Sequence, residues 1–121
     1  MRIKRIDYDF SVCKVIDYSE VDLEQEFCFV SKTDEEKSLV CNTSFVPGNV
    51  IDRDDGWKAF RIQGTLDFSL IGILSKISSM LADNNIGIFA VSTYNTDYIL
   101  TKENHFDKAI EVLSDAGYQV E

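Results

Sequence analysis

The segment Val91–Leu100 places a run of polar side chains between two apolar ends. Its sequence is VSTYNTDYIL, and all six residues from Ser92 to Asp97 carry a hydroxyl, amide or carboxylate group. A plain β-hairpin turn needs only two such residues. Hydroxyl and carboxylate oxygens accept hydrogen bonds from an ammonium group. The segment is therefore a candidate binding site for a charged small molecule.

A second candidate group precedes an expected helix that starts near Ser69. Asp67 or Ser69 can cap this helix, and its first turn has free backbone N–H groups at the positive end of the helix dipole. These donors suit a carboxylate, while the carboxylates of Asp67 and Asp97 suit an ammonium group. Together they fit a free amino acid, and two aspartates favour a basic one such as arginine or lysine. Taken singly, each residue is more typical of a helix cap or a turn than of a binding site, so only their joint placement favours a site.

The sequence shows no catalytic or phosphate-binding motif, such as G-x-S-x-G, G-x-G-x-x-G, a P-loop or H-E-x-x-H. A metal site would need Cys13, Cys28, Cys41 and His105 to converge without any local ligand spacing. Three cysteines in strand-like surroundings instead indicate buried, reduced thiols. We therefore expect a protein that is not an enzyme and has no cofactor or metal.

Composition limits the fold and the partners. The chain has 121 residues, of which 45% are hydrophobic, so it can form a real core. A net charge of −9, without a basic stripe, makes nucleic acid and anionic membranes poor partners. No apolar run approaches the roughly 18 residues of a membrane span, and no signal-peptide segment follows Met1. We expect a soluble, cytoplasmic protein.

Residues 57–121 predict the element order β-α-β-β-α-β. Residues 57–63 alternate as in a strand, residues 69–84 and 106–116 have helical spacing, and residues 86–100 form a hairpin that turns near Asn95. Residues 118–120 return as a short strand. This order predicts a ferredoxin-like α+β domain, with a four-stranded antiparallel sheet and two helices on one face.

Residues 1–50 resemble a reduced copy of the same plan. A strand is expected at 11–16, a short turn or helix at 19–24, and a hairpin at 27–41. The segments FCFVS and IFAVS, at residues 27–31 and 88–92, lie about sixty positions apart. We expect two tandem lobes, at residues 1–50 and 57–121, joined by a turn-rich, acidic connector at residues 51–56.

Three segments resemble the ACT domain family: GTLDFSLIGIL at residues 64–74, LADNNI at residues 81–86 and STYNTDY at residues 92–98. The resemblance is strong over residues 57–121 and loose over 10–50. It is greatest to small, stand-alone proteins with tandem ACT-like lobes, which are related to the regulatory lobes of aspartate kinase and to the cytosolic arginine sensor of the TOR pathway. One departure is that Asp67 is not followed by the Pro-Gly pair of many ACT domains, which leaves the ligand's identity open.

The resemblance implies a regulatory module that binds a small ligand, usually an amino acid, at the seam between two ACT lobes. It also implies a homodimer and a regulated protein partner. The alternative is an interaction module that uses its ACT surface only for self-association or for a protein partner. The implied ligand-binding residues are Leu66, Asp67, Phe68, Ser69, Gly72, Ser92, Thr93, Asn95, Thr96 and Asp97.

Overall fold

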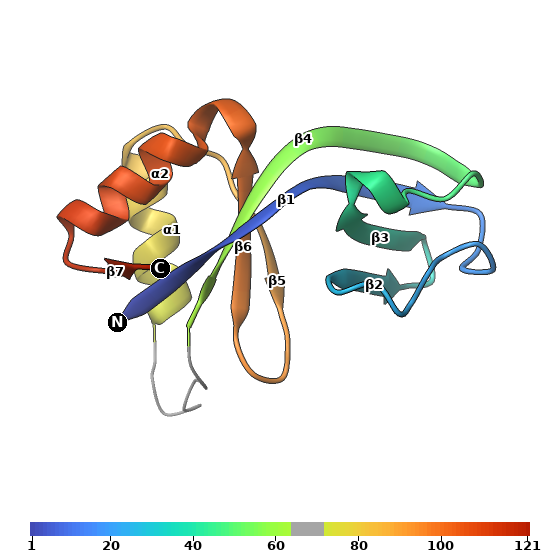
Figure 1. Ribbon diagram of the computed structural model, residues 1–121, viewed down its shortest axis with the longest axis horizontal. Coiled ribbons are helices and arrows are strands. Elements are labelled where there is room, and N and C mark those ends of the chain that lie inside the picture. Colours follow the sequence, from blue (N-terminus) through green and yellow to red (C-terminus); the bar gives the residue numbers. More distant parts are fainter. Residues whose placement is uncertain (64–71) are drawn as a thin grey trace. The chain divides into compact units, whose positions relative to one another are not determined.

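The computed structural model describes residues 1–63 and 72–121. Figure 1 shows the fold, a mixed α+β arrangement of curled antiparallel sheet and helices. In chain order the elements are β1 (Arg2–Val15), β2 (Cys28–Lys32), β3 (Lys37–Asn42), the 3-10 helix η1 (Thr43–Phe45), β4 (Val50–Ile62), α1 (Ile73–Asp83), β5 (Phe89–Ser92), β6 (Asp97–Lys102), α2 (Glu103–Asp115) and β7 (Gln119–Val120).

The chain forms two compact units. The C-terminal unit comprises Met1–Asp7 and Lys58–Glu121, and the N-terminal unit comprises Tyr8–Trp57. Strands β1 and β4 each contribute residues to both units. The first seven residues therefore belong with the C-terminal half of the sequence, because their strand pairs there.

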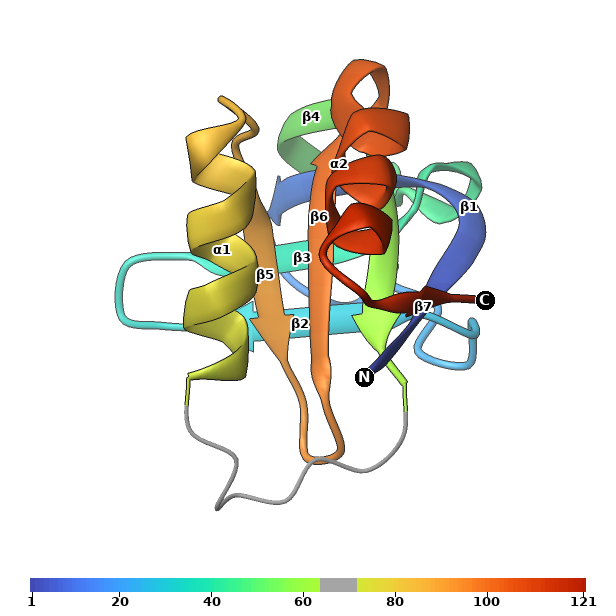
Figure 2. The same cartoon turned by 90° about the vertical axis from the view of Figure 1, so that its left-hand side faces the viewer.

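In the C-terminal unit, α1 and α2 lie on the same face of the sheet that contains β4, β6 and β5 (Figure 2). The predicted hairpin is confirmed, since β5 and β6 pair antiparallel from Phe89↔Leu100 to Ser92↔Asp97. The end of the sheet differs from the expected four strands. There β1 lies next to β4, and β7 pairs in parallel with β1 rather than with β4.

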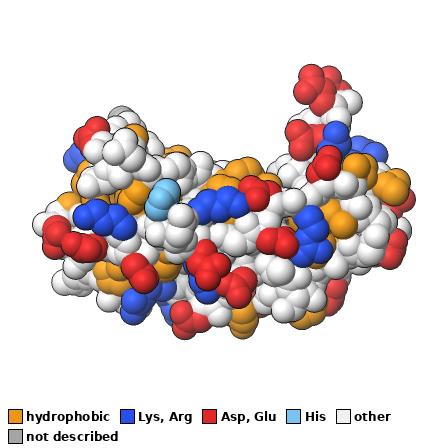
Figure 3. Space-filling view, turned by 90° about the horizontal axis from the view of Figure 1, so that it is seen from above, with side chains coloured by type: hydrophobic (Ala, Val, Ile, Leu, Met, Phe, Trp, Pro, Cys, Tyr) orange, Lys and Arg blue, Asp and Glu red, His pale blue; other side chains and the backbone are white. Residues whose placement is uncertain are grey.

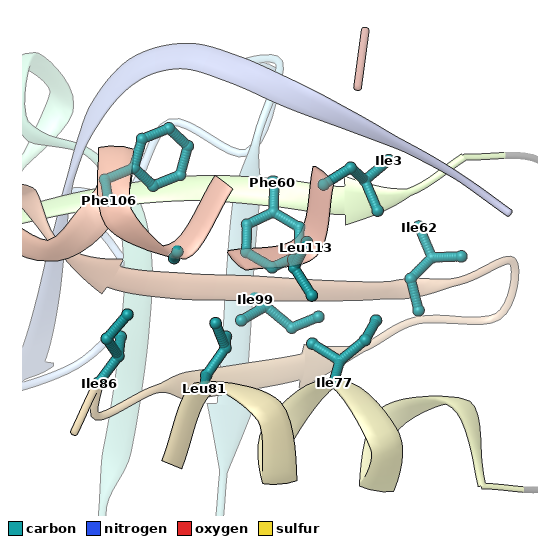
Figure 4. Close-up of a cluster of buried hydrophobic side chains, with 10 residues drawn as sticks. Ile3, Phe60, Ile62, Ile77, Leu81, Ile86, Ile99, Phe106 and Leu113 are labelled. Atoms are coloured by element: carbon teal, nitrogen blue, oxygen red, sulfur yellow. The ribbon is translucent and has the colours of Figure 1, made fainter. Parts of the chain in front are cut away.

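One hydrophobic core holds this unit together (Figure 4). Helical spacing places Ile77 and Leu81 of α1 on the face that meets the sheet, and α2 does the same with Ala109 and Leu113. Strands β4 and β6 meet these helices with buried side chains. The buried members of the core are Ile3, Phe60, Ile62, Ile77, Leu81, Ile86, Ile99, Phe106, Ala109 and Leu113.

Both helices end as the sequence predicts. Asn85 has the left-handed φ of 60°, and the N–H of Ile86 donates to the carbonyl of Leu81, which closes α1. Gly117, with φ of 99°, closes α2 in the same way. The helix starts differ from the predictions. Helix α2 starts at Glu103 with Lys102 as N-cap, before the expected start at residue 106.

Helix α1 begins at Ile73, with Gly72 as its N-cap. The expected start near Ser69 lies outside the described residues. Strand β6 ends at Lys102, and α2 begins at the next residue, Glu103. The acidic side chain of Glu103 therefore lies in the first turn of α2, where the helix dipole favours a negative charge. This explains the earlier start of α2.

The N-terminal unit has the strand order β2-β3-β1-β4. Its sheet carries a core of Cys13, Val15, Leu39 and Cys41, against which Tyr18, Val21, Val46 and other partly buried side chains pack. All of Tyr8–Trp57 is described, and within it the only helix is the three-residue η1. The segments that join its strands therefore cover the sheet in place of α-helices.

The hairpins of the two units have the same geometry. Strand β3 (Lys37–Asn42) and strand β6 (Asp97–Lys102) start sixty positions apart and have the same burial pattern along their length. The pair Phe29↔Val40 in one hairpin corresponds to Phe89↔Leu100 in the other at the same offset. Each turn is closed by a threonine N–H, since Thr33 donates to Glu36 O at 2.9 Å and Thr93 to Thr96 O at 2.8 Å.

Residues 51–56, expected as a turn-rich connector, lie inside β4. The acidic side chains from Asp52 to Asp55 are exposed, and exposed charges do not prevent a backbone from joining a sheet. Arg53 reduces the repulsion by forming a 3.0 Å ion pair with Asp55. The expected strand at residues 11–16 is likewise part of the longer β1. The expected boundaries thus differ from those of the two units.

The hydrophobic core predicts that two substitutions on α1 change the free energy of unfolding by very different amounts. Ile77 is fully buried, so Ile77→Ala should lower the free energy of unfolding by about 2–5 kcal/mol through lost burial and a cavity. Ser79→Ala, at an exposed position of the same helix, should change it by less than about 0.5 kcal/mol. Chemical denaturation measures both. Equal losses for the two variants would contradict the assigned core.

Candidate functional site

The turn between β5 and β6 is held by the backbone and by Thr93. The N–H of Thr93 donates to the carbonyl of Thr96 at 2.8 Å, and the Thr93 hydroxyl donates to the same carbonyl at 3.0 Å. Asn95 is exposed at the tip of the turn. Thr93 therefore acts here mainly on the turn itself, while Asn95 remains accessible from solvent.

Ser92 and Asp97 face each other where the hairpin opens into its strands. They form a register pair, and the Ser92 hydroxyl donates to Asp97 Oδ1 at 2.6 Å. Alternate residues of a strand share a face, so Asp97 lies on the same face as Ile99, which packs in the core beneath the helices. The carboxylate is half-buried and oriented by a neutral donor, and its charge is not neutralised by that bond.

Thr96 fixes the turn to the neighbouring strand. It is 6% exposed, and its hydroxyl donates to the carbonyl of Ile62 at 2.7 Å. Ile62 is the last residue of β4. The turn is thus attached to the end of β4 by a buried hydrogen bond, which makes Thr96 a positioning residue for Ser92 and Asp97.

The start of α1 lies at the same end of the C-terminal unit as this turn, as both ribbon views show (Figures 1 and 2). Gly72 is exposed and has the left-handed φ of 83°, and its carbonyl accepts from Lys76 N at 2.8 Å. Gly72 provides no side-chain cap. The first N–H groups of a helix have no acceptor within the helix, and such groups can donate to a ligand.

The structure thus places Gly72, Ser92, Thr93, Asn95, Thr96 and Asp97 at one end of the same unit. The other expected site residues, Leu66, Asp67, Phe68 and Ser69, lie outside the described residues.

Sequence reasoning did not single out Arg61. Its Nη1 donates to the Tyr98 hydroxyl at 3.1 Å, and its Nε donates to Gln63 Oε1 at 3.0 Å. Its guanidinium carbon lies 5.9 Å from the centre of the Tyr98 ring, within the range of a cation–π interaction. Arg61 is flanked by the buried Phe60 and Ile62, and this alternation could have indicated an outward-facing cation.

The three cysteines converge on the N-terminal unit, although the sequence spacing did not indicate it. Cys28 and Cys41 form a register pair of β2 and β3, and Cys13 and Cys41 belong to the same buried cluster. All three are free thiols. Burial raises the pKa of Cys13 and Cys28, and it raises the pKa of Cys41 to about 12. These thiols are therefore protonated and poorly nucleophilic at neutral pH.

Within residues 1–63 and 72–121, no group of three or more His, Cys, Asp or Glu side chains is arranged to hold a metal ion. His105, the only histidine, is exposed on α2. On the face shown in Figure 3, basic side chains lie among acidic ones rather than in one continuous stripe. In the same described part of the chain, no helix is long and apolar enough to cross a membrane.

These features define the protein as an α+β domain of ferredoxin-like type with polar residues around the β5–β6 turn. The ACT domain model matches residues 52–115, which is more than half of the chain. The chain therefore belongs to the ACT domain family. ACT domains are regulatory, non-catalytic modules that commonly bind small molecules and oligomerise.

Solved structures agree with this assignment. A crystal structure of an Agobacterium tumefaciens protein has 31% identity and a TM-score of 0.84, and the match covers 99% of this chain and 91% of that one. A Vibrio cholerae protein of unknown function has 16% identity and a TM-score of 0.72, with coverage of 94% and 88%. A search of the curated proteins gave no match.

Aspartate kinases share the fold at low identity. A structure of aspartokinase alpha and beta subunits has 16% identity and a TM-score of 0.63, and it covers 96% of this chain and 97% of that one. The aspartate kinase of Clostridium acetobutylicum, described as an allosteric enzyme, has 16% identity and a TM-score of 0.68. This second match covers 94% of this chain and 33% of the kinase.

The buried thiols predict a stability change at high pH. The pKa of Cys41 is raised from an ordinary 9.0 to about 12 in the folded protein, so the unfolded thiol ionises first as pH rises. The Cys41 contribution is complete below pH 9 and is lost towards pH 12, by up to about 1.4 kcal/mol per pH unit. Between pH 8 and pH 10.5, Cys41→Ala should therefore lose less unfolding free energy than the wild type. If urea denaturation shows that the two proteins lose the same unfolding free energy over this pH range, the prediction is contradicted.

Proposed function

We propose that this ACT protein is a sensor module that binds a free amino acid where the β5–β6 turn meets the start of α1. The observation that carries the proposal is the Ser92–Asp97 pair, a half-buried carboxylate held in place at the same end of the unit as the α1 N-terminus. Membership of a family of regulatory modules supports it. The expected position of this site at a seam between two lobes stays a prediction.

The chemistry suits a zwitterion. The ligand's carboxylate would accept hydrogen bonds from the first N–H groups of α1, where the helix dipole is positive. Its ammonium group would donate to the Asp97 carboxylate, which Ser92 already orients through Oδ1. A second aspartate, Asp67, would favour a basic amino acid, and Asp67 lies outside the described residues.

We also propose that the two units arose as tandem ACT-like lobes, the N-terminal one reduced. The sixty-residue offset of β3 and β6, their matching burial and their matching turn bonds support it. The strand order β2-β3-β1-β4 of the N-terminal unit is also that of a ferredoxin-like sheet in which the first and last strands pair. In this view the segment after β1 and the helix η1 stand where a full lobe has α-helices.

The central test is the substitution Asp97→Ala. A thermal-shift screen of the twenty amino acids on the wild-type protein should identify a stabilising ligand, which adds about 2.7 kcal/mol at 100 times its Kd. Asp97→Ala should fold with nearly the same melting temperature and lose most of that stabilisation. The control is Asp107→Ala, which removes an exposed carboxylate of α2 in the same unit and should keep the response.

Two outcomes contradict this function. The first is that no amino acid shifts the melting temperature of the wild-type protein. The second is that Asp97→Ala melts far lower than the wild type while its amino-acid response is unchanged, because Asp97 would then be a structural turn residue.

The alternative function, a protein-interaction module, is favoured by the edge strands. Strand β5 is the last strand in the order of its sheet, and among the described residues only β6 pairs with it. An open edge is a template for pairing with another strand, in a partner or a second copy. Exposed Val30 on β2, the edge strand of the N-terminal unit, adds an apolar surface.

Self-association through β5 makes a separate prediction. The wild-type protein should sediment as a homodimer at about 50 µM, a concentration at which modest interfaces form. Ala90→Lys, an exposed position of β5, should shift it towards monomer, because a charged edge strand opposes pairing. Ala82→Lys adds the same charge to exposed α1 and should leave the dimer intact. A monomeric wild-type protein would rule out this association.

A further inference from the structure

We propose that a cavity in the N-terminal unit is a second ligand site, which binds the ammonium end of a small aliphatic amine that carries no carboxylate. The cavity has a volume of about 180 Å³. Every described residue that lines it belongs to Tyr8–Trp57, and none of them belongs to the turn at Asp97. The lining residues are Tyr8, Gln25, Glu26, Phe27, Asn42 and Phe45.

Aromatic rings form much of the wall. The ring of Phe27 lies 6.0 Å from that of Tyr8 in a tilted arrangement and 6.2 Å from that of Phe10 edge to face, so its position is fixed. Phe45, at the end of η1, is 45% exposed. Faces of aromatic rings attract cations, and such walls are typical of sites for organic ammonium groups.

The polar part of the lining includes the carboxylate of Glu26 and the side-chain amides of Gln25 and Asn42. The Tyr8 hydroxyl donates to Glu26 Oε2 at 2.9 Å, which orients this carboxylate at the cavity. Gln25 Nε2 donates to the carbonyl of Asp22 at 2.7 Å. Gln25 Oε1 is buried and has no hydrogen-bond partner within residues 1–63 and 72–121. A buried acceptor without a partner is costly, and this atom lies within the wall rather than open to the cavity.

The net negative charge of this unit favours a cationic ligand. Residues 8–57 hold 12 of the 21 acidic but only 4 of the 12 basic residues, a net charge of −8 out of −9. The segment before β2, residues 16–27, has five acidic residues and neither lysine nor arginine. Among the described residues, the cavity lining also includes no lysine or arginine. A ligand carboxylate would thus meet repulsion without a counterion, whereas an amine would meet attraction.

The size limits the ligand further. Ligand pockets usually have volumes of about 300–1,000 Å³, so a cavity of about 180 Å³ suits only a short alkyl chain with its ammonium group. A second ammonium at the far end of such a chain would remain near the acidic segment. Aliphatic diamines therefore match the cavity and its surroundings.

The probe is cadaverine, 1,5-diaminopentane, titrated into the full chain by calorimetry at 150 mM salt, which screens distant charges. We expect saturable binding with a stoichiometry of one. Lysine is the same diamine with an added carboxylate, and it should bind this cavity at least tenfold more weakly. Asp97→Ala should leave cadaverine binding unchanged, so this result is independent of the amino-acid site.

Two matched variants locate the site. Glu26→Gln removes the lining carboxylate and should weaken cadaverine binding at least tenfold, while Glu24→Gln removes the same charge two positions away and should change it less than twofold. Phe45→Ala should also weaken binding, and circular dichroism checks that each variant is folded. Absence of saturable cadaverine binding would overturn the proposal. Equal weakening by Glu26→Gln and Glu24→Gln would also overturn it, because cadaverine would then be attracted by the overall negative charge and not by the cavity.

Discussion

Antiparallel pairing of β1 with β4 supports every other element of the structure. Near one end of this pair Gln63 N donates to Arg2 O at 2.9 Å, and near the other Ile16 N donates to Asn49 O at 3.3 Å. Both bonds define the same register. In the C-terminal unit β1 also receives β7 on its second edge, and in the N-terminal unit it receives β3. In the strand order, β1 and β4 are the neighbours that join β2 and β3 on one side to β6 and β5 on the other.

This pairing also explains which parts of the fold sequence reasoning could predict. Helices and hairpins depend on residues that are neighbours in sequence, and their periodicity predicted α1, α2 and both hairpins. Strand β1 depends on β4, some fifty residues away. Its buried residues Ile3, Ile6 and Phe10 are spaced by three and four positions, so no strand alternation is visible, and its charged residues suggest a flexible end. Only non-local pairing makes it a strand.

The same limit applies to the candidate sites. The polar residues from Ser92 to Asp97 are neighbours in one turn, so their types and spacing are enough to indicate a candidate site there. The hydrogen bond from Thr96 to Ile62, and that from Arg61 to Tyr98, join strands distant in sequence and could not be predicted. The cavity of the N-terminal unit needs Tyr8, Phe27 and Phe45 to converge from three segments, and no spacing indicates it.

A comparison of the two hairpins indicates which features of the Asp97 site the fold itself requires. Sixty positions before Ser92 and Asp97 stand Lys32 and Lys37, which form the corresponding register pair. Two lysines cannot make a hydrogen bond like that from Ser92 to Asp97, yet the N-terminal turn has the same strand register and the same threonine bond. Thr33 and Thr93 are therefore sufficient to shape the turn. The geometry of this hairpin therefore does not require a carboxylate at position 97. A ligand site would explain why an oriented, half-buried carboxylate is present there.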